Sequence, residues 1–282
     1  MIDFHSAIIH PPHPNSAAWY IQYYSAFNLS QITNNVLFMY LHTFCENSFI
    51  NQKGHYEKIE RMDIFHNEIS DAIDEAMTEM QARIQSHLHI MLCGGIQLKN
   101  IPTQYQIDKD TLLSSVNTNN WYELLKGFLN VWEFLFLFSI TETALKKALG
   151  TDLAAFKLID EINFKYVNFF QNRKYTYSFE MTNSLWKLYT KLRNVYAHKH
   201  GFFDEEDLIK IKKDRKIFLK IYNGEIGLLE KTFFSLEKKD FFKTKNYTKS
   251  KFCLITDTEL NIFKFCTSNL LYQLSLANQE AN

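Results

Sequence analysis

Apolar residues recur along most of this chain at the three- and four-residue spacing of amphipathic helices. The clearest stripe runs through Ile59, Met62, Ile69 and Ile73 in a long segment that ends at Cys93-Gly94-Gly95. The pattern predicts a first helix capped at Asn15-Ser16 and a second from Ser30 to about residue 47. Further helices are expected over residues 55–91 (continuous or with one break), 120–149 (closed by Gly150), 152–172, 180–200, 204–214 and 258–277.

One segment departs from this periodicity. Residues 216–230, KIFLKIYNGEIGLLE, contain two β-prone runs around Asn223-Gly224, a pair typical of type I′ hairpin turns. A short strand is also expected over 252–255. The predicted fold is therefore mainly α, a helical bundle with a small β-hairpin appendage near the C-terminus.

The polar stretch 99–120 is the best candidate boundary between an N-terminal helical region, 1–110, and a domain spanning 111–282. The first region either stands apart or belongs to the same bundle.

Composition supports long helices with an aromatic core. The chain has 282 residues with 8 Gly, 4 Pro, 25 Phe and 15 Tyr, which argues against a β-sandwich or a low-complexity chain. The formal net charge is zero, so an overall basic coat for nucleic acid is excluded. Residues 185–251 nevertheless hold 17 Lys or Arg against 9 Asp or Glu, while 57–80 hold eight acids and two bases. This asymmetry indicates either a local anion-binding face or ordinary solvated helix surfaces.

The remaining composition indicates a cytoplasmic protein without a cofactor or metal. Cys45, Cys93, Cys253 and Cys266 form no CxxC pair, and no phosphate-binding, zincin or hydrolase motif occurs. The histidines near the N-terminus and the set His87, His89 and Cys93 are read as ordinary residues rather than metal ligands. No export segment is recognised, and Glu133 interrupts the apolar run around 134–138, which we interpret as part of a buried helix rather than a membrane span.

The segment NSLWKLYTKLRNVYAHKHG, residues 183–201, is the most informative part of the sequence. On a helix its apolar residues form one stripe that is expected to face the core: Leu185, Leu188, Tyr189, Leu192, Val195 and Tyr196. Asn194 and His198 are four residues apart and share a face nearly opposite that stripe, with Arg193 at its flank. His198 is therefore expected to be exposed to solvent or to lie in an interface with another chain.

The run from Arg193 and Asn194 to His198 resembles the signature of the HEPN superfamily (higher eukaryotes and prokaryotes nucleotide-binding), in which a histidine follows an arginine about one to two helical turns later. A polar residue, often Asn, follows the arginine in its RNases. The same bare spacing occurs at 61–66 and 83–89, but without Asn after the arginine. The resemblance covers about residues 115–201. It implies a helical bundle and a metal-independent endoribonuclease, in which the ribose 2′-hydroxyl attacks and a 2′,3′-cyclic phosphate remains.

The resemblance also implies roles and partners. His198 would transfer protons, Arg193 would stabilise the phosphorane, and Asn194 would hold the phosphate or orient the histidine. Two such motifs would meet across a homodimer in one composite site. RNA is the expected substrate, and such proteins often act as toxins or antiviral effectors restrained by a separate antitoxin or regulator.

Three other residues are candidates for supporting roles. Glu142 could orient Arg193, whereas Lys199 and His200 could contact RNA phosphates or simply complement the helix dipole. The alternative to an RNase is a non-catalytic HEPN-like module that binds RNA, a nucleotide or a protein. A third interpretation is a purely structural interaction protein in which 193–201 is only a helix end.

Overall fold

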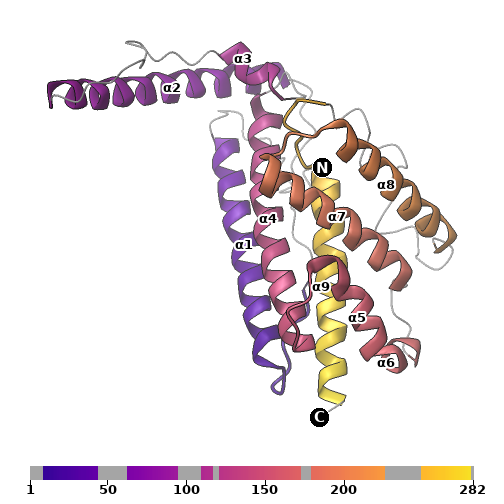
Figure 1. Cartoon of the computed structure of the whole chain (residues 1–282). Helices are drawn as coiled ribbons and strands as arrows, with labels where there is room; N and C mark the ends of the chain where they lie inside the picture. Colours follow the sequence, from indigo (N-terminus) through magenta and orange to yellow (C-terminus); the bar gives the residue numbers. More distant parts are fainter. Residues whose placement is uncertain are drawn as a thin grey trace, which may run out of the picture. The chain divides into compact units, whose positions relative to one another are not determined.

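The structure is a computed structural model that describes residues 9–43, 62–94, 109–116, 121–172, 179–225 and 249–280. Its regular elements are helices (Figure 1): α1 (Ala18–Thr43), α2 (Met62–Cys93), α3 (Lys109–Ser114), α4 (Trp121–Leu149), the 3₁₀ turn η1 (Ala155–Lys157), α5 (Leu158–Lys165), α6 (Val167–Asn172), α7 (Phe179–Lys199), α8 (Glu205–Glu225) and α9 (Asp257–Glu280). The chain divides into two units, one formed by Met1–Asp3 with Leu37–Lys126 and the other by Phe4–Val36 with Gly127–Asn282.

The smaller unit contains α2 and α3. The long helix expected over 55–91 is confirmed where it is described, from Met62 to Cys93. It ends as predicted, with the amide of Gly94 donating to the carbonyl of Ile90 at 2.9 Å. In the same unit the Phe38 and Tyr122 rings meet edge to face, with centroids 6.2 Å apart.

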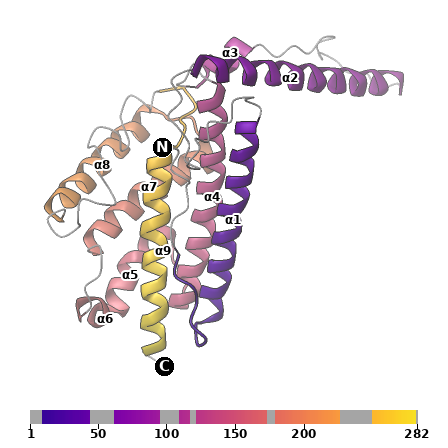
Figure 2. The same ribbon diagram turned by 180° about the vertical axis from the view of Figure 1, so that it is seen from behind.

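The larger unit is a bundle in which α1, α4 and α9 run alongside one another (Figures 1 and 2). Its core is rich in aromatic residues, because Phe, Tyr and Trp side chains from α4, α7 and α9 are buried there among aliphatic ones. The Phe138 ring of α4 stacks on Trp186 of α7 with centroids 4.7 Å apart, and Phe134 meets Phe263 of α9 at 5.1 Å. Such pairs add about 0.5–1.5 kcal/mol each beyond their burial, so the aromatic content stabilises the bundle directly.

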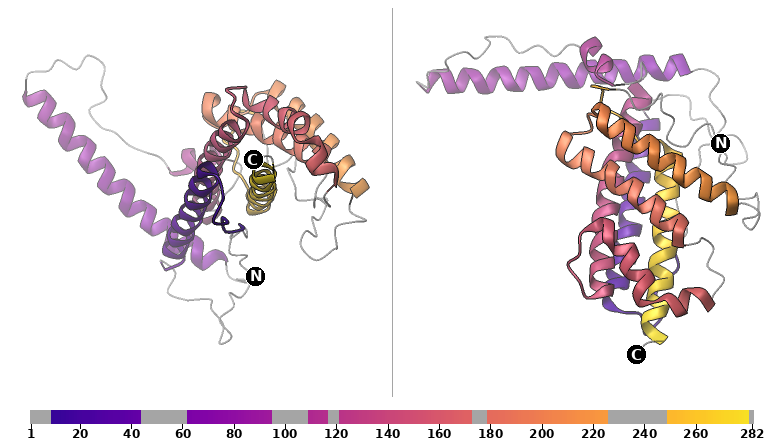
Figure 3. Two further views of the ribbon diagram at one scale, coloured as in Figure 1. Left: turned by 90° about the horizontal axis from the view of Figure 1, so that it is seen from below. Right: turned by 45° about the vertical axis from the view of Figure 1, so that its right-hand side comes forward.

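Helix α1 is continuous where two helices were expected. Ser30 lies inside it, and the prediction of a new helix there is wrong because a single serine does not interrupt a helix without a neighbouring Gly or Pro. The buried stripe of Tyr20, Tyr23 and Phe27 extends through Asn34 on the same face. Hydrogen bonds join α1 to α4 near both ends of the stripe, from the Asn34 amide to Glu133 and from Lys147 Nζ to Gln22 Oε1 at 2.8 Å. The two helices are therefore antiparallel and side by side (Figure 3).

The predicted β-hairpin is wrong for the residues described. Helix α8 continues through 216–225, with Asn223-Gly224 in its last turn, while 226–230 lie outside the described residues. The helical stripe explains this result, because Ile211 and Phe218 are seven residues apart and both are buried. Near 252–255 the described residues show a single antiparallel bridge between Phe202 and Phe252 in place of the expected strand.

Gly150 ends helix α4. Gly150 after α4 has φ of +66°, and the Thr151 amide donates to the Lys146 carbonyl at 3.1 Å, as in a Schellman motif, so the predicted cap is confirmed. The single helix expected over 152–172 is instead divided into η1, α5 and α6. Tyr166, with φ of −120°, separates the last two.

Helix α4 is the one described helix that is long and apolar enough to cross a membrane by length and composition. Half of its most apolar window is buried inside the protein. Glu133, which interrupts the apolar run in the sequence, lies within the buried side rather than on the surface.

Candidate functional site

Helix α7 places the candidate residues, and its burial follows the predicted phase. All six residues of the apolar stripe are buried: Leu185, Leu188, Tyr189, Leu192, Val195 and Tyr196. Two tyrosine hydroxyls anchor the helix, since Tyr189 donates to the Glu259 carbonyl and Tyr196 donates to the Cys253 carbonyl at 2.6 Å. Burial raises the pKa of both tyrosines well above the ordinary value of 10.0. Helix α7 is thus fixed in rotation, and so is the direction of its opposite face.

Arg193, Asn194 and His198 lie together on the outer side of α7. Asn194 and His198 are exposed one turn apart, as the helical phase predicts, and Arg193 is half-buried. The Arg193 guanidinium lies over the Phe138 ring, with its central carbon 5.8 Å from the ring centroid, and Nη1 donates to Asn194 Oδ1 at 3.0 Å. The cation–π contact and the hydrogen bond together hold the guanidinium over α4. Arg193 and Asn194 therefore act as one pre-oriented pair beside an exposed imidazole.

Lys199 contributes to structure rather than to a free cationic surface. Its Nζ lies 2.6 Å from both Asp204 Oδ2 and Asp207 Oδ2. The two aspartates also cap α8 reciprocally, since the Asp207 amide donates to Asp204 Oδ1 at 2.9 Å and the Asp204 amide to Asp207 Oδ2 at 3.3 Å. The hydrogen bond from Lys199 lowers the pKa of Asp204 to about 2. Lys199 thus ties the end of α7 to the start of α8.

His200 and Gly201 form the end of α7. Both have positive φ, 52° and 81°, and the Gly201 amide donates to the Val195 carbonyl at 3.3 Å. This confirms that the helix stops at Gly201. The His200 side chain is exposed, and its left-handed backbone turns it away from the helical register of His198.

Two glutamates of α4, the candidate Glu142 and the buried Glu133, have different environments. Glu142 forms an ion pair with Lys146 on its own helix, with 2.9 Å between the carboxylate oxygen and Nζ, so the structure does not bring it to Arg193. Glu133 is almost fully buried, where it contacts Lys264 Nζ at 2.5 Å and accepts a hydrogen bond from Asn34. We name Asn34, Glu133 and Lys264 the buried polar triad; it joins α1, α4 and α9.

The buried polar triad was not found by sequence reasoning. Lys264 is completely buried, and burial lowers its pKa while the Glu133 carboxylate acts in the opposite direction. A second buried contact lies nearby, since the Asn130 amide donates to the Ile255 carbonyl at 3.1 Å and to Asp257 Oδ1 at 2.8 Å. The sequence feature that indicates such buried polar groups is the pair Asn130 and Glu133, three residues apart in an otherwise apolar helix. Together these contacts join α1, α4 and α9, while Asn130 Oδ1 is buried without a hydrogen-bond partner.

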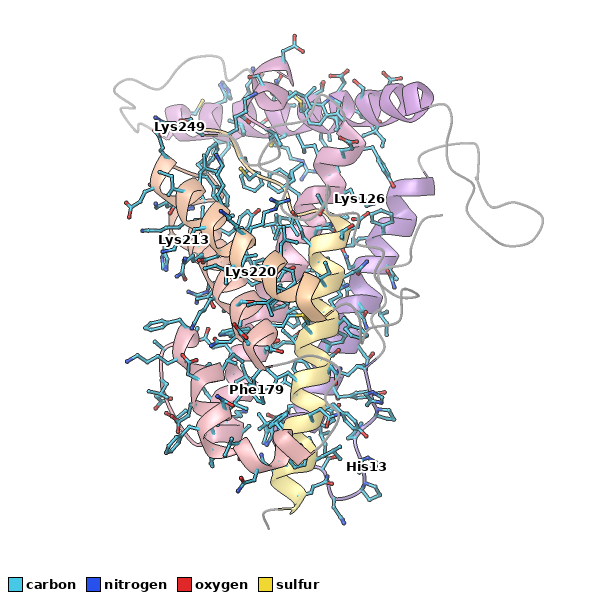
Figure 4. The ribbon with its side chains drawn as sticks, turned by 90° about the vertical axis from the view of Figure 1, so that its right-hand side faces the viewer. His13, Lys126, Phe179, Lys213, Lys220 and Lys249 are labelled. Atoms are coloured by element: carbon cyan, nitrogen blue, oxygen red, sulfur yellow. The ribbon has the colours of Figure 1, made fainter. Side chains whose placement is uncertain are left out.

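Part of the local basic excess lies on the outward side of α8. Lys213, Lys216 and Lys220 recur at three- and four-residue spacing and are exposed; Figure 4 labels Lys213 and Lys220 on this helix. Lys210, nearer the start of the helix, pairs with Glu206. The three exposed lysines form a cationic row of the kind that contacts phosphates.

Metal chemistry has no support in the described residues. Among them, no group of three or more His, Cys, Asp or Glu side chains is close enough to hold an ion. His10 and His13 lie against the ring of Tyr272, with His10 stacked at 4.2 Å, and Cys93 Sγ lies 3.6 Å from His89 Nε2. The arrangement that remains is an exposed imidazole beside a fixed guanidinium and amide.

Comparison of the chain with known protein families, with curated proteins and with solved structures gives no match.

Proposed function

We propose that this protein is a metal-independent endoribonuclease of the HEPN type, with Arg193, Asn194 and His198 as its catalytic residues. The observation that carries the proposal is that all three lie on the outer side of α7, with Arg193 already hydrogen-bonded to Asn194. A motif that served only as helix surface would not need a half-buried guanidinium held by both a ring and an amide.

The chemistry follows from these side chains. A ribose 2′-hydroxyl attacks the adjacent phosphorus, and the bond from phosphorus to the 5′-oxygen breaks, leaving a 2′,3′-cyclic phosphate. One imidazole accepts the 2′-proton and another protonates the leaving 5′-oxygen, a division of labour that imidazoles can perform near neutral pH. Arg193 is permanently charged and forked, so it stabilises the developing negative charge on the phosphorane. Asn194 Nδ2 remains available to bind a phosphate oxygen, because its Oδ1 is the atom that faces Arg193.

Two imidazoles require two copies of α7. The proposal therefore includes a homodimer in which His198 of each copy serves one composite site, with RNA as substrate. Lys213, Lys216 and Lys220 provide a row of cations on α8, which would bind the RNA backbone in a salt-dependent manner. An RNase of this kind fits a toxin or antiviral effector restrained by a separate protein.

A second candidate function is a non-catalytic HEPN-like module that binds RNA, a nucleotide or a protein. One observation favours it: within the described residues no hydrogen bond orients the His198 ring, whereas catalytic imidazoles usually have an orienting partner. On this alternative Arg193 and Asn194 hold a phosphate without cleavage.

The deciding experiment measures cleavage of total RNA in EDTA by the wild type and by His198→Ala, with analysis of product ends. Cleavage that leaves 2′,3′-cyclic phosphate and falls at least about 100-fold in the variant supports the proposal. His200→Ala is the matched control at the same helix end, and His89→Ala tests the second Arg–His spacing on α2; both should retain activity. Equal cleavage by wild type and His198→Ala would reject the site, and salt-sensitive binding without cleavage would favour the second function.

A further inference from the structure

Two phenylalanine side chains are exposed on the segment formed by η1 and α5. Phe156 of η1 is 51% exposed, and Phe164, in the last turn of α5, is 83% exposed. Lys157 Nζ lies over the Phe156 ring, 5.7 Å from its centroid. We name Phe156, Lys157 and Phe164 the aromatic platform. Single exposed apolar residues are common on proteins, so the meaning of these rings depends on what lies beside them.

The aromatic platform belongs to a segment that lies against the first half of α7 (Figure 1). Trp186 Nε1 of α7 donates to the carbonyl of Ala155, the residue before Phe156, at 2.7 Å. Further along the segment, Asp160 Oδ1 accepts a hydrogen bond from Asn183 Nδ2 at 2.6 Å. These two contacts hold η1 and α5 on one side of α7.

The candidate site occupies the same side of α7, about two turns further along. Trp186 and Arg193 are seven residues apart, so they share a side of the helix and are separated by about 10 Å along its axis. Side chains also connect the two places, because the Arg193 guanidinium lies over the Phe138 ring and that ring stacks on Trp186 with centroids 4.7 Å apart. A substrate bound at Arg193 therefore has Phe156 beside it in the direction of the start of α7.

We infer that the aromatic platform stacks the bases of a single-stranded RNA whose scissile phosphate lies at Arg193, Asn194 and His198. Stacked nucleotides follow one another at about 3.4 Å along a strand, so the separation of about 10 Å corresponds to about three nucleotides. Inside a duplex each base is covered by its neighbours, whereas unpaired bases can stack on a protein ring. The inference rests on the proposed function for its ligand and adds the class of RNA and a second binding site.

The chemistry of the aromatic platform suits a base. Every base has a π-face, and stacking on a ring is stronger than an exposed contact between an ammonium and a ring, so a base displaces Lys157 from Phe156. The displaced ammonium, on its flexible stem, then pairs with a phosphate of the strand. Asp160 of α5 is held by Asn183 and lies 3.8 Å from Lys187 Nζ, which offsets its repulsion of that phosphate.

The experiment measures RNA binding in EDTA by the full chain carrying His198→Ala, called here the parent, in which the proposed cleavage is removed. The probes are a fluorescein-labelled single strand of about 12 nucleotides and the duplex of the same sequence, followed by fluorescence anisotropy. The parent should bind the single strand at least about fivefold more tightly than the duplex. Adding Phe156→Ala or Phe164→Ala should each weaken single-strand binding at least about fivefold, whereas Phe156→Tyr, which keeps a ring, should retain it.

Leu29→Ala is the matched control, since Leu29 is a large apolar residue that is 63% exposed but lies on α1; it should bind RNA like the parent. A single 2-aminopurine in the strand reports stacking directly, because its fluorescence is quenched when it stacks. Its quenching on binding should be smaller with Phe156→Ala than with the parent. Circular dichroism melts check that each variant is folded.

Three results would overturn the inference: equal affinity of the parent for single strand and duplex, Phe156→Ala binding as tightly as Leu29→Ala, or no binding of the single strand by the parent. The RNase proposal is judged separately by cleavage. Cleavage by the wild type with unchanged binding in Phe156→Ala would contradict this inference alone. Stacking on Phe156 without cleavage by the wild type would contradict the RNase alone.

Discussion

Removing one charge of the buried polar triad should destabilise this protein far more than removing both. The test compares Lys264→Met, Glu133→Leu and the double variant. Lys264 is completely buried and Glu133 almost so, with 2.5 Å between Nζ and Oε1. Each single variant leaves one charge in the core without its main partner.

The magnitude follows from this geometry. Breaking a buried ion pair on one side costs about 3–5 kcal/mol of unfolding free energy, whereas replacing both members by apolar residues is often neutral or stabilising. In the double variant the Asn34 amide loses its acceptor, which costs about 1–3 kcal/mol and offsets the apolar gain. We therefore expect the double variant within about 1 kcal/mol of the wild type, and a coupling free energy above about 3 kcal/mol.

The wild type, the two single variants and the double variant form a double-mutant cycle. Urea unfolding at pH 7, followed by circular dichroism and tryptophan fluorescence, measures the unfolding free energy of all four proteins. Lowering the pH should partly rescue Lys264→Met, because the isolated buried Glu133 carboxyl binds a proton more tightly in the folded than in the unfolded state. Additive losses in the double variant would refute the reasoning, since they would mean that the two charges do not interact. A loss below about 1 kcal/mol in both single variants would refute the burial of the pair.

Further predictions concern the helix ends and the buried tyrosines. Gly201→Ala should lose about 2–4 kcal/mol in urea unfolding, because φ is +81° and the added Cβ would meet the Phe252 ring. Unfolding free energy should decrease as the pH rises above 10, where Tyr196 ionises in the unfolded but not the folded chain; Tyr196→Phe should reduce that slope, and an unchanged slope would contradict its burial. Asp204→Ala should weaken the start of α8 and leave Lys199 paired with Asp207 alone, seen as faster amide hydrogen exchange in α8 and unchanged exchange in α4.

Local periodicity predicted the helices that position the candidate site. The six-residue stripe of α7 specifies which side is buried, so the exposure of Asn194 and His198 could be derived without tertiary information. The Schellman end at Gly150 was predictable for the same reason, since glycine is the residue that best adopts the left-handed conformation.

The two wrong predictions, the β-hairpin and the helix start at Ser30, lie where a local sequence signal competes with packing in the fold. Asn223-Gly224 favours a hairpin turn in isolation, but Ile211 and Phe218 bury the same side of a continuing helix, and that packing prevails. Serine favours the start of a helix, and Ser30 alone therefore predicts one, but α1 has a continuous buried stripe that runs through it. In both cases tertiary burial outweighs a local propensity of a fraction of a kcal/mol.

The site was predictable in part. Its residues and their direction came from the sequence, but the contact of Arg193 with Phe138 and the capture of Lys199 by two aspartates depend on packing between helices. The same holds for Glu133, because a buried carboxylate in an apolar helix implies a partner without indicating that it is Lys264 of α9. Contacts between residues so far apart in the sequence can be identified only once the fold is known.

The continuity of α1 and α4 across the two units has a consequence for dissecting the chain. Residues 18–36 of α1 supply Tyr20, Phe27 and Asn34 to the same unit as Gly127–Asn282, although residues 37–126 of the other unit lie between them in the sequence. A fragment of residues 111–282 would therefore expose the core that α1 covers and leave Glu133 without Asn34. A backbone cut between Thr43 and Trp121 leaves α1 and α4 on different pieces, and these should stay bound as a non-covalent complex. Fragment complementation, with neither piece folding alone, is the behaviour that this topology dictates.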